Sequence, residues 1–573
     1  MIESLLRLID RRKVLICTLV GAAVGTFVGW HALDPQFIAG TGGKWVRPEN
    51  DFVAYLVAWN YFLVDDWRLP LFTLPAMGYP EGGNVLFNDA LPLAALPTKV
   101  LYQLAGLRIN PFGWWIFLTY ILQGAMGARL VCAVGVRSVW AAAAGAALAV
   151  VNASFVSRMG HTALSSHFLL LWALSLYFES VRRGRAKAVE LSVLLALTLL
   201  INSYLFAMVA AFGAAMFVAL WFRGQLPWRD VRTAALGAAL VAVLGIVAGY
   251  GVFLVSPTTM KSEGFGLYSW NLVTLLLPRD GLFGHLAGVA RDATKGQYEG
   301  DAYVGHGVLL LLALALVFTP RKALAHIRVH WVYVVALLAF AAYAASNKVY
   351  LGPTLIVEYP LPQFALDLGN YFRATGRFIW PLAYSLALLP LACLFRWWHP
   401  APAIAAAALA VFLQVDEGWD ALRYRRTLTR AAAEDLINTP VMNSWLAQHH
   451  KLWQFPSWAC GGLGGTKRWA GNPEANRELQ VQLAAAQAGV PTNSVYTSRL
   501  LKNCPIEFTW ANDPQLEDGV LYVLGPEAVA ASPTLTRLAH TNACVTLDWS
   551  VVCSRKWLAM AADRAAASQA APK

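Results

Sequence analysis

The chain has 573 residues, of which 58% are hydrophobic and only 14% are charged. Soluble proteins carry about 25% charged residues, so the composition excludes an ordinary soluble protein and indicates a helical membrane protein with several spans. The formal net charge of +12 does not indicate nucleic-acid binding, because the basic residues lie mainly in short loops between apolar runs, where they set membrane orientation.

The first apolar run covers about residues 14–33 and follows a basic cluster at residues 7–13. This order predicts an uncleaved first span with a cytoplasmic N-terminus. A cleaved signal peptide fits less well, because the run is long and lacks a small-residue cleavage pattern. Gly21, Gly25 and Gly29 recur every four residues, which is typical of a face that packs tightly on another helix. Scattered small residues in a glycine-rich chain are the alternative.

A long first loop, residues 34–110, is predicted to lie outside the membrane. Loops of this length are usually functional or disordered, and its aromatic content argues against disorder. Apolar residues at spacings of three and four predict an amphipathic helix in the membrane interface. These residues are Phe52, Tyr55, Leu56, Trp59 and Phe62. Asp51 lies just before them, near the positive end of the helix.

Ten further apolar runs complete a prediction of about 11 transmembrane helices. They cover about residues 111–134, 139–151, 164–178, two runs within 191–222, 234–254, 308–318, 332–345, a run that ends near 396, and 403–415. This arrangement puts the basic cluster at residues 182–187 inside, and the loops at 256–305 and 346–375 outside. The C-terminal region then lies outside as well.

The composition changes near residue 416. A polar helical linker, residues 416–433, is predicted to lead into a small soluble α/β domain, residues 434–573. Residues 520–524 and 545–552 have strand composition, and residues 477–489 have helix composition. The alanine-rich tail after residue 560 is predicted to be frayed or disordered.

Four cysteines lie in this polar C-terminal part. An even set outside the spans indicates disulfides and an oxidising compartment. One pairing compatible with the sequence joins Cys544 to Cys553 around a hairpin at Trp549-Ser550 and Cys460 to Cys504, and the connectivity is left open. Metal ligation is disfavoured because no Cys-x-x-Cys spacing or paired histidine accompanies them. The other three cysteines lie in apolar runs and are predicted to be inert thiols.

Asp51 and Asp89 are the candidate catalytic residues. A carboxylate at a membrane surface is costly to bury, and beside a sugar or phosphate it can act as a general base or hold a metal ion. The simpler alternative is that each caps a helix, because both lie where a helix is predicted to start.

Arg373 and Arg377 are four residues apart at the predicted start of the tenth span. One face of a helix would present both at the outside surface. Two guanidinium groups there suit a phosphate, which they can bind bidentately. The alternative is contact with lipid headgroups.

Four further residues in outside loops are candidates for substrate binding. Tyr298 and Glu299 lie in a glycine-containing loop, for which a surface turn is the simpler alternative. Arg158 and His161 lie at the outside ends of the third and fourth spans. A lone histidine is more often a structural group than a ligand.

Seven short motifs, in order between residues 50 and 381, resemble a bacterial branch of the GT-C superfamily of membrane glycosyltransferases. They are Asn50-Asp51 with Tyr55-Leu-Val-Ala-Trp59, Trp67-Arg-Leu-Pro70, Tyr79-Pro-Glu-Gly82, Asn88-Asp89-Ala-Leu-Pro-Leu-Ala94, Gly160-His161 with Leu164, Gln297-Tyr-Glu-Gly300 with Ala302-Tyr303, and Arg373-Ala-Thr-Gly-Arg377-Phe. The resemblance implies a GT-C-like fold in the bacterial inner membrane with a periplasmic C-terminal domain.

The resemblance also implies an inverting transfer of a sugar from a polyprenyl-phosphate donor to a periplasmic glycan or lipid. Asp51 would deprotonate the acceptor and Asp89 would hold it, while Arg373 and Arg377 would stabilise the leaving phosphate. Better-studied members carry paired acids, but here Phe52 follows Asp51, so a divalent metal is left open and no other cofactor is expected. Membrane lipids are expected partners.

Two other functions are compatible with the sequence. A transporter or flippase of lipid-linked glycans should carry ionisable groups deep within its spans and internal repeats, and this chain has few of the first and none of the second. A non-catalytic envelope assembly factor could keep the same scaffold. Replacement of Asp51 by Asn would distinguish an enzyme from such a factor.

Overall fold

The computed structural model describes residues 2–158, 160–252, 264–278, 291–463, 472–498 and 504–558. The chain divides into two compact units. The helical unit comprises Met1–Gly40, Phe112–Gly245 and Met260–Arg430, and the mixed unit comprises Thr41–Pro111, Ile246–Thr259 and Ala431–Lys573. The first loop and the C-terminal region therefore belong to one unit.

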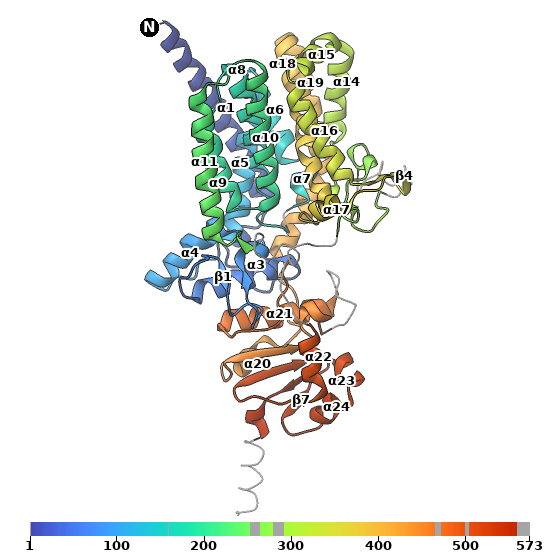
Figure 1. Ribbon diagram of the computed structural model, residues 1–573. Coiled ribbons are helices and arrows are strands. Elements are labelled where there is room, and N and C mark those ends of the chain that lie inside the picture. The colour runs from blue at the N-terminus through green and yellow to red at the C-terminus, as the bar shows by residue number, and fades with distance from the viewer. Residues whose placement is uncertain are drawn as a thin grey trace, which may run out of the picture. The chain divides into compact units, whose positions relative to one another are not determined.

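A helix forms at each of the eleven apolar runs that the sequence singles out, and the long helices run side by side (Figure 1). They are α1 (Ile2–Ala32), α5 (Phe112–Ala133), α6 (Val139–Val150), α8 (Phe168–Arg183), α9 (Ala188–Leu199), α10 (Ser203–Phe222), α11 (Trp228–Ala248), α14 (His306–Phe318), α16 (Trp331–Ala345), α18 (Trp380–Trp397) and α19 (Pro400–Arg430).

Six helices in the described part of the chain are long and apolar enough to cross a membrane, which confirms the prediction of a helical membrane protein. Five of them lie within α1, α5, α10, α11 and α19, and the sixth, Thr375–Trp397, consists of α18 and the turn that precedes it. Helix α14 and the next helix, α15 (Pro320–Val329), are bent by 100° and could count as a seventh. The number eleven stays a prediction. The predicted end of the seventh span, part of the loop at 256–305, and the tail after residue 560 lie outside the described residues.

The glycines of α1 form a packing face against α5, as predicted. A Cβ atom on Gly21 would lie 2.4 Å from the carbonyl oxygen of Gly124, and one on Gly25 would lie 2.1 Å from that of Tyr120. A Cβ on Gly29 would lie 2.8 Å from the Cβ of Tyr120. Because two of these neighbours are backbone atoms, only glycine fits, and the alternative of scattered small residues is rejected.

The mixed unit is built around α3 (Asp51–Val64), the helix predicted in the first loop. The prediction that this helix is amphipathic and lies in the membrane interface is wrong. Every residue from Phe52 to Leu63 is buried, because α4 (Pro92–Ala105) and α21 (Pro473–Ala488) pack against it. The Tyr61 hydroxyl also donates to the carbonyl oxygen of Val490 at 2.6 Å. A helix that is apolar all round is a core helix.

The C-terminal part of this unit is a four-stranded sheet with helices, which confirms the predicted α/β domain. The strands are β5 (Lys451–Phe455), β6 (Val520–Leu524), β7 (Cys544–Thr546) and β8 (Val551–Cys553), in the order β5-β6-β8-β7. Strands β5 and β6 are parallel, and the other pairs are antiparallel. Residues 545–552 thus form a hairpin instead of one strand.

Both predicted disulfides are present. Cys460 is bonded to Cys504, and Cys544 is bonded to Cys553 across the β7–β8 pair. The predicted linker is the end of α19, which continues to Arg430.

Candidate active site

The predicted site residues fall in both units. Asp51 and Asp89 belong to the mixed unit, and the six candidate binding residues belong to the helical unit.

Asp51 is held by a tyrosine from the C-terminal region. It is the first residue of α3, and the N-cap position belongs to Asn50, so the capping alternative is not realised for Asp51. The Tyr496 hydroxyl donates to Oδ1 of Asp51 at 2.7 Å. The side-chain amide of Asn88, the residue before Asp89, donates to the carbonyl oxygen of Tyr496 at 2.8 Å. One residue therefore contacts both acid-bearing segments.

The loop that carries Tyr496 is fixed on several sides. The backbone N–H of Tyr496 donates to Oε1 of Gln482 at 2.8 Å, and the centre of the Tyr496 ring lies 4.9 Å from the centre of the Trp458 ring. Two residues further on, the N–H of Ser498 donates to the carbonyl oxygen of Phe87 at 3.0 Å. A hydroxyl on such a supported loop is positioned before any ligand arrives.

The backbone beside both acids adopts a conformation that side chains disfavour. Asn50, Asp89 and Leu91 have φ values of 54°, 55° and 50°. Left-handed backbone is uncommon for residues other than glycine and gathers at functional sites. Leu91 is the N-cap of α4, and Pro92 is its first residue, so Asp89 does not occupy the capping position.

Glu299 is the centre of a buried charge cluster in the helical unit. It lies in the 3₁₀ turn η4 (Gln297–Gly300). Nη2 and Nε of Arg377 donate to its two carboxylate oxygens at 2.9 and 3.1 Å. Nη1 of Arg158 also donates to Oε2 of Glu299, and Nη2 of Arg158 donates to the carbonyl oxygen of Tyr298 at 3.1 Å. The structure therefore brings together Arg158, Tyr298, Glu299 and Arg377.

Two glycines, Gly300 and Gly376, allow the turn that carries Glu299 to approach the turn that carries Arg377. A Cβ atom on Gly376 would lie 2.8 Å from the Cα of Gly300, and one on Gly300 would lie 3.2 Å from the Cα of Gly376. The N–H of Gly376 also donates to the carbonyl oxygen of Tyr268 at 2.8 Å. The close backbone approach needs glycine on both sides, and it sets Arg377 against Glu299.

The electrostatics favour an ionised Glu299. Burial opposes the charge, but the guanidiniums of Arg377 and Arg158, with a smaller contribution from His161, outweigh it and hold the pKa of Glu299 below the usual glutamate range. Arg158 is 3% exposed and Arg377 is 8% exposed.

The prediction that Arg373 and Arg377 share one face of a helix is wrong. Arg377 lies in the 3₁₀ turn η5 (Thr375–Ile379), α18 starts only at Trp380, and Arg373 precedes both. Nη2 of Arg373 donates to the Tyr268 hydroxyl at 2.6 Å, and the guanidinium lies 4.5 Å from the centre of that ring. The two side chains are aimed by different partners, although Arg373 remains on the same loop.

Sequence reasoning missed Tyr496 and Tyr268. Neither lies in one of the resembling motifs, and each is recognised only by its contact with a motif residue. In the described ranges, no group of three or more His, Cys, Asp and Glu side chains is placed to hold a metal ion.

The chain matches two family models, "Domain of unknown function (DUF6311)" over residues 22–418 and "DUF6311 C-terminal domain" over residues 441–555. No curated protein matches the chain.

Among solved structures, the chain is similar to an Archaeoglobus fulgidus oligosaccharyltransferase tethered to an acceptor peptide, with 11% identity and a TM-score of 0.44. The match covers 88% of this chain and 68% of the archaeal one. The oligosaccharyltransferase AglB of the same organism, in complex with an inhibitory peptide and a dolichol-phosphate, matches with 11% identity and a TM-score of 0.42, over 83% of this chain and 64% of that one. ArnT from Cupriavidus metallidurans in the apo state matches with 14% identity and a TM-score of 0.42, over 93% and 96%.

Proposed function

The chain belongs to the DUF6311 family, and we propose that it is a membrane glycosyltransferase of the GT-C type. The reaction is the transfer of a sugar from a polyprenyl-phosphate donor to a glycan or lipid acceptor at the periplasmic face of a bacterial inner membrane, with inversion.

The excess of positive charge around Glu299 carries this proposal. The site contains three arginines, Arg158, Arg373 and Arg377. Glu299 is the carboxylate that Arg158 and Arg377 share. A site with more guanidiniums than carboxylates attracts an anion, and Arg373, the arginine that does not share Glu299, is exposed. Guanidinium groups bind phosphate oxygens with paired hydrogen bonds, and a lipid phosphate is the anion that a membrane transferase releases.

Asp51 supplies the base. Its carboxylate accepts a proton from the acceptor hydroxyl while the acceptor oxygen bonds to the anomeric carbon from the face opposite the phosphate. The bond between that carbon and the phosphate oxygen breaks, and the electron pair leaves with the lipid phosphate. The Tyr496 hydroxyl, 2.7 Å from Oδ1 of Asp51, orients the carboxylate. Asp89 holds the acceptor.

The leaving phosphate gains negative charge as the bond breaks. Arg373 and Arg377 are already aimed by Tyr268 and Glu299, so they need little reorganisation when that charge appears. The apolar surface between the helices holds the prenyl chain.

Replacement of the proposed base tests this function. The full chain would be reconstituted with a lipid extract that contains polyprenyl-phosphate-linked sugars, and released polyprenyl phosphate would be measured by mass spectrometry. Asp51→Asn should lower release by about 100-fold or more, because a general base contributes that much, while donor binding is retained. Asp66→Asn is the matched control, since Asp66 is an exposed acid of the same loop and should release lipid phosphate at the wild-type rate.

Two results would contradict the proposal. Equal release by Asp51→Asn and Asp66→Asn would remove the catalytic role of Asp51 and favour an assembly factor. Movement of the intact donor between leaflets without cleavage would identify a flippase.

A further inference from the structure

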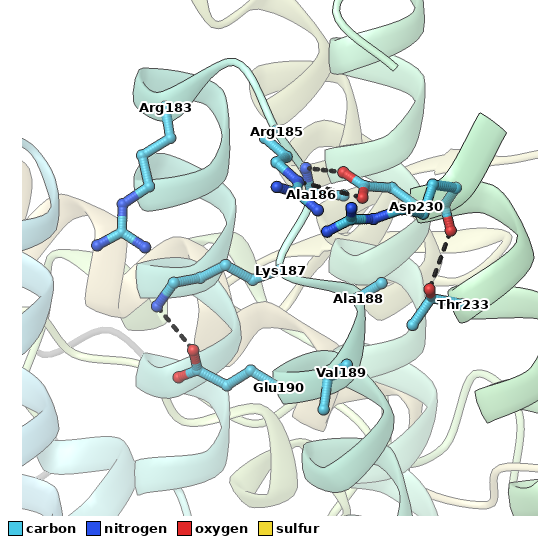
Figure 2. A pocket seen from close by; sticks show the side chains of 10 residues that line it. Arg183, Arg185, Ala186, Lys187, Ala188, Val189, Glu190, Asp230 and Thr233 are labelled. Atoms are coloured by element: carbon cyan, nitrogen blue, oxygen red, sulfur yellow. Dashed lines mark hydrogen bonds and ion pairs between the residues drawn. The ribbon is translucent and has the colours of Figure 1, made fainter. Parts of the chain in front are cut away.

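A pocket of about 390 Å³ lies where α8 ends and α9 and α11 begin, and none of the candidate site residues lines it (Figure 2). Its lining is strongly basic. The lining residues are Arg183, Arg185, Ala186, Lys187, Ala188, Val189, Glu190, Arg229, Asp230 and Thr233. The sequence predicts that this end of the helices is cytoplasmic.

Four cations and two carboxylates line the pocket, so its net charge is positive. The carboxylates are already engaged, since Nε of Arg185 lies 3.3 Å from Oδ1 of Asp230 and Nζ of Lys187 lies 2.7 Å from Oε2 of Glu190. In the described part of the chain, Arg183 and Arg229 have no carboxylate within ion-pair distance. A positively charged pocket with two such arginines is suited to an anion.

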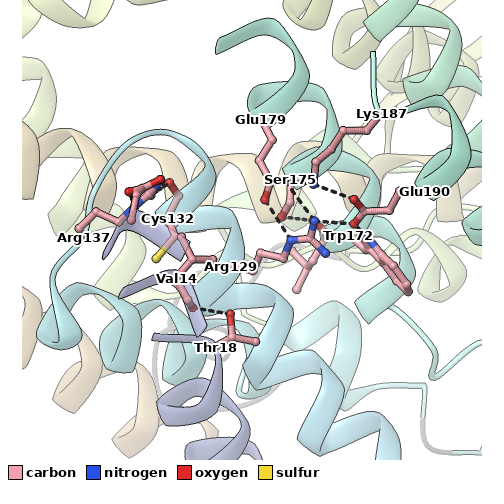
Figure 3. Close-up of polar contacts among 12 residues, drawn as sticks. Val14, Thr18, Arg129, Cys132, Arg137, Trp172, Ser175, Glu179, Lys187 and Glu190 are labelled. Atoms are coloured by element: carbon pink, nitrogen blue, oxygen red, sulfur yellow. Dashed lines mark hydrogen bonds and ion pairs between the residues drawn. The ribbon is translucent and has the colours of Figure 1, made fainter. Parts of the chain in front are cut away.

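A partly buried ion-pair network includes two residues of the pocket lining, Lys187 and Glu190 (Figure 3). Arg129 of α5 pairs with Glu179 at 3.0 Å and with Glu190 at 2.5 Å, and Lys187 also pairs with Glu179. The indole N–H of Trp172 donates to Oε1 of Glu190 at 2.8 Å. Because these groups neutralise one another, the charge that remains for a ligand comes from the arginines at the rim.

Backbone groups add to the attraction. Lys187 is the N-cap of α9, and no side chain caps this helix end. Ala188 and Val189, in its first turn, line the pocket. The first N–H groups of a helix have no partner within the helix, and they favour anions together with the helix dipole.

Exposed apolar side chains continue from the pocket along α9 and α11. Val189 is 66% exposed, Leu236 is 66% exposed and Leu240 is 71% exposed. The two helices pack closely, since a Cβ atom on Gly237 would lie 1.8 Å from the hydroxyl oxygen of Ser192. A basic pocket that opens onto an apolar helix face matches a ligand with an anionic head and hydrocarbon chains.

We propose that this pocket binds the phosphate headgroup of an anionic phospholipid, whose acyl chains lie along α9 and α11. Arg183 and Arg229 contact the phosphate from the rim, and the start of α9 contacts it from below. The site is separate from the proposed transferase site, and it would anchor the α8–α9–α11 corner in the membrane.

Lipid retention tests the proposal. The full chain would be purified in detergent with equal amounts of phosphatidylglycerol and phosphatidylcholine, and bound lipid would be counted by native mass spectrometry. Wild type should retain one phosphatidylglycerol in preference to phosphatidylcholine. The double variant Arg183→Gln/Arg229→Gln should bind phosphatidylglycerol roughly 30-fold more weakly, because two basic contacts at a membrane surface are lost. The control Arg232→Gln, an exposed arginine of α11 outside the pocket lining, should bind it like wild type.

A second arm separates a lipid from a free phosphate. Millimolar inorganic phosphate should leave the retained phosphatidylglycerol in place, because the acyl chains hold it. The proposal is overturned if wild type retains both lipids equally, if inorganic phosphate displaces the lipid, or if the double variant and Arg232→Gln bind alike. The wild-type arms decide the question even if the double variant does not fold.

Discussion

Replacement of Glu299 by Gln should destabilise the helical unit strongly. The substitution keeps the shape of the side chain but removes the charge that Arg158 and Arg377 share. Loss of one partner of a buried ion pair costs about 3–5 kcal/mol, because the remaining charge has no counter-ion. Both guanidiniums are less than one tenth exposed, so water cannot take the place of the carboxylate, and we expect a loss of about 4 kcal/mol.

Chemical unfolding of the purified chain in detergent micelles would measure this effect. Glu358→Gln is the matched control, because Glu358 pairs with Lys348 at 3.0 Å while both side chains are nearly half exposed. Exposed ion pairs contribute little, so the control should unfold like wild type. Equal unfolding midpoints for Glu299→Gln and Glu358→Gln would refute the reasoning that the cluster is a buried, mutually dependent set of charges.

The pH dependence gives a second measurement on the same pair of proteins. The pKa of Glu299 is lower in the folded state than in the unfolded state, so its ionisation stabilises the fold above the unfolded pKa, about 4.3 for glutamate. The stability difference between wild type and Glu299→Gln should therefore be constant from neutral pH down to about pH 5 and shrink as the pH falls below about 4. A difference that grew on acidification would contradict this sign.

Three further outcomes follow from other contacts. Tyr496→Phe should lower transfer about tenfold, measured as polyprenyl phosphate release, because it removes a hydrogen bond to a charged acceptor, worth about 1.5–3 kcal/mol; unchanged release would remove the orienting role. Gly376→Ala should lower the unfolding midpoint because its Cβ would lie 2.8 Å from backbone, whereas Gly160→Ala, with nothing within 4 Å, should not. Replacing Cys460 and Cys504 by Ala should destabilise the mixed unit by about 4 kcal/mol, for a disulfide that closes a loop of 44 residues; a loss under about 1 kcal/mol in urea unfolding would contradict the loop-closure account.

Features encoded by near neighbours in the sequence were predictable. Apolar runs locate the helices because burial or lipid exposure demands them along the whole run. The repeat of Gly21, Gly25 and Gly29 locates a packing face because residues four apart share one side of a helix. The presence of disulfides followed from an even set of cysteines in a polar region, whereas their pairing was left open by the sequence.

Features encoded by distant residues were not predictable. Glu299 is the counter-ion of Arg158 and Arg377, which lie 141 and 78 residues away in the sequence, so an inspection of its own loop suggests only a surface turn. Helix α3 has aromatic residues at amphipathic spacing, but α21 packs against it. The spacing of apolar residues within a helix does not reveal that a helix about 400 residues later in the chain will bury the rest of its surface. The same limit hid the contact of Tyr496 with Asp51.

The composition of the mixed unit has a consequence for how the protein is made. Helix α3 ends at Val64, and α21, which packs against it, begins at Pro473, so roughly 410 residues must be translated before the two helices can meet. At about 5–20 residues per second, a newly made chain would wait roughly 20–80 s with an apolar helix that α21 does not yet cover. During that interval α3 is expected to bind chaperones or the surface of the bilayer. A stalled or truncated chain that lacks α21 should therefore be degraded instead of accumulating.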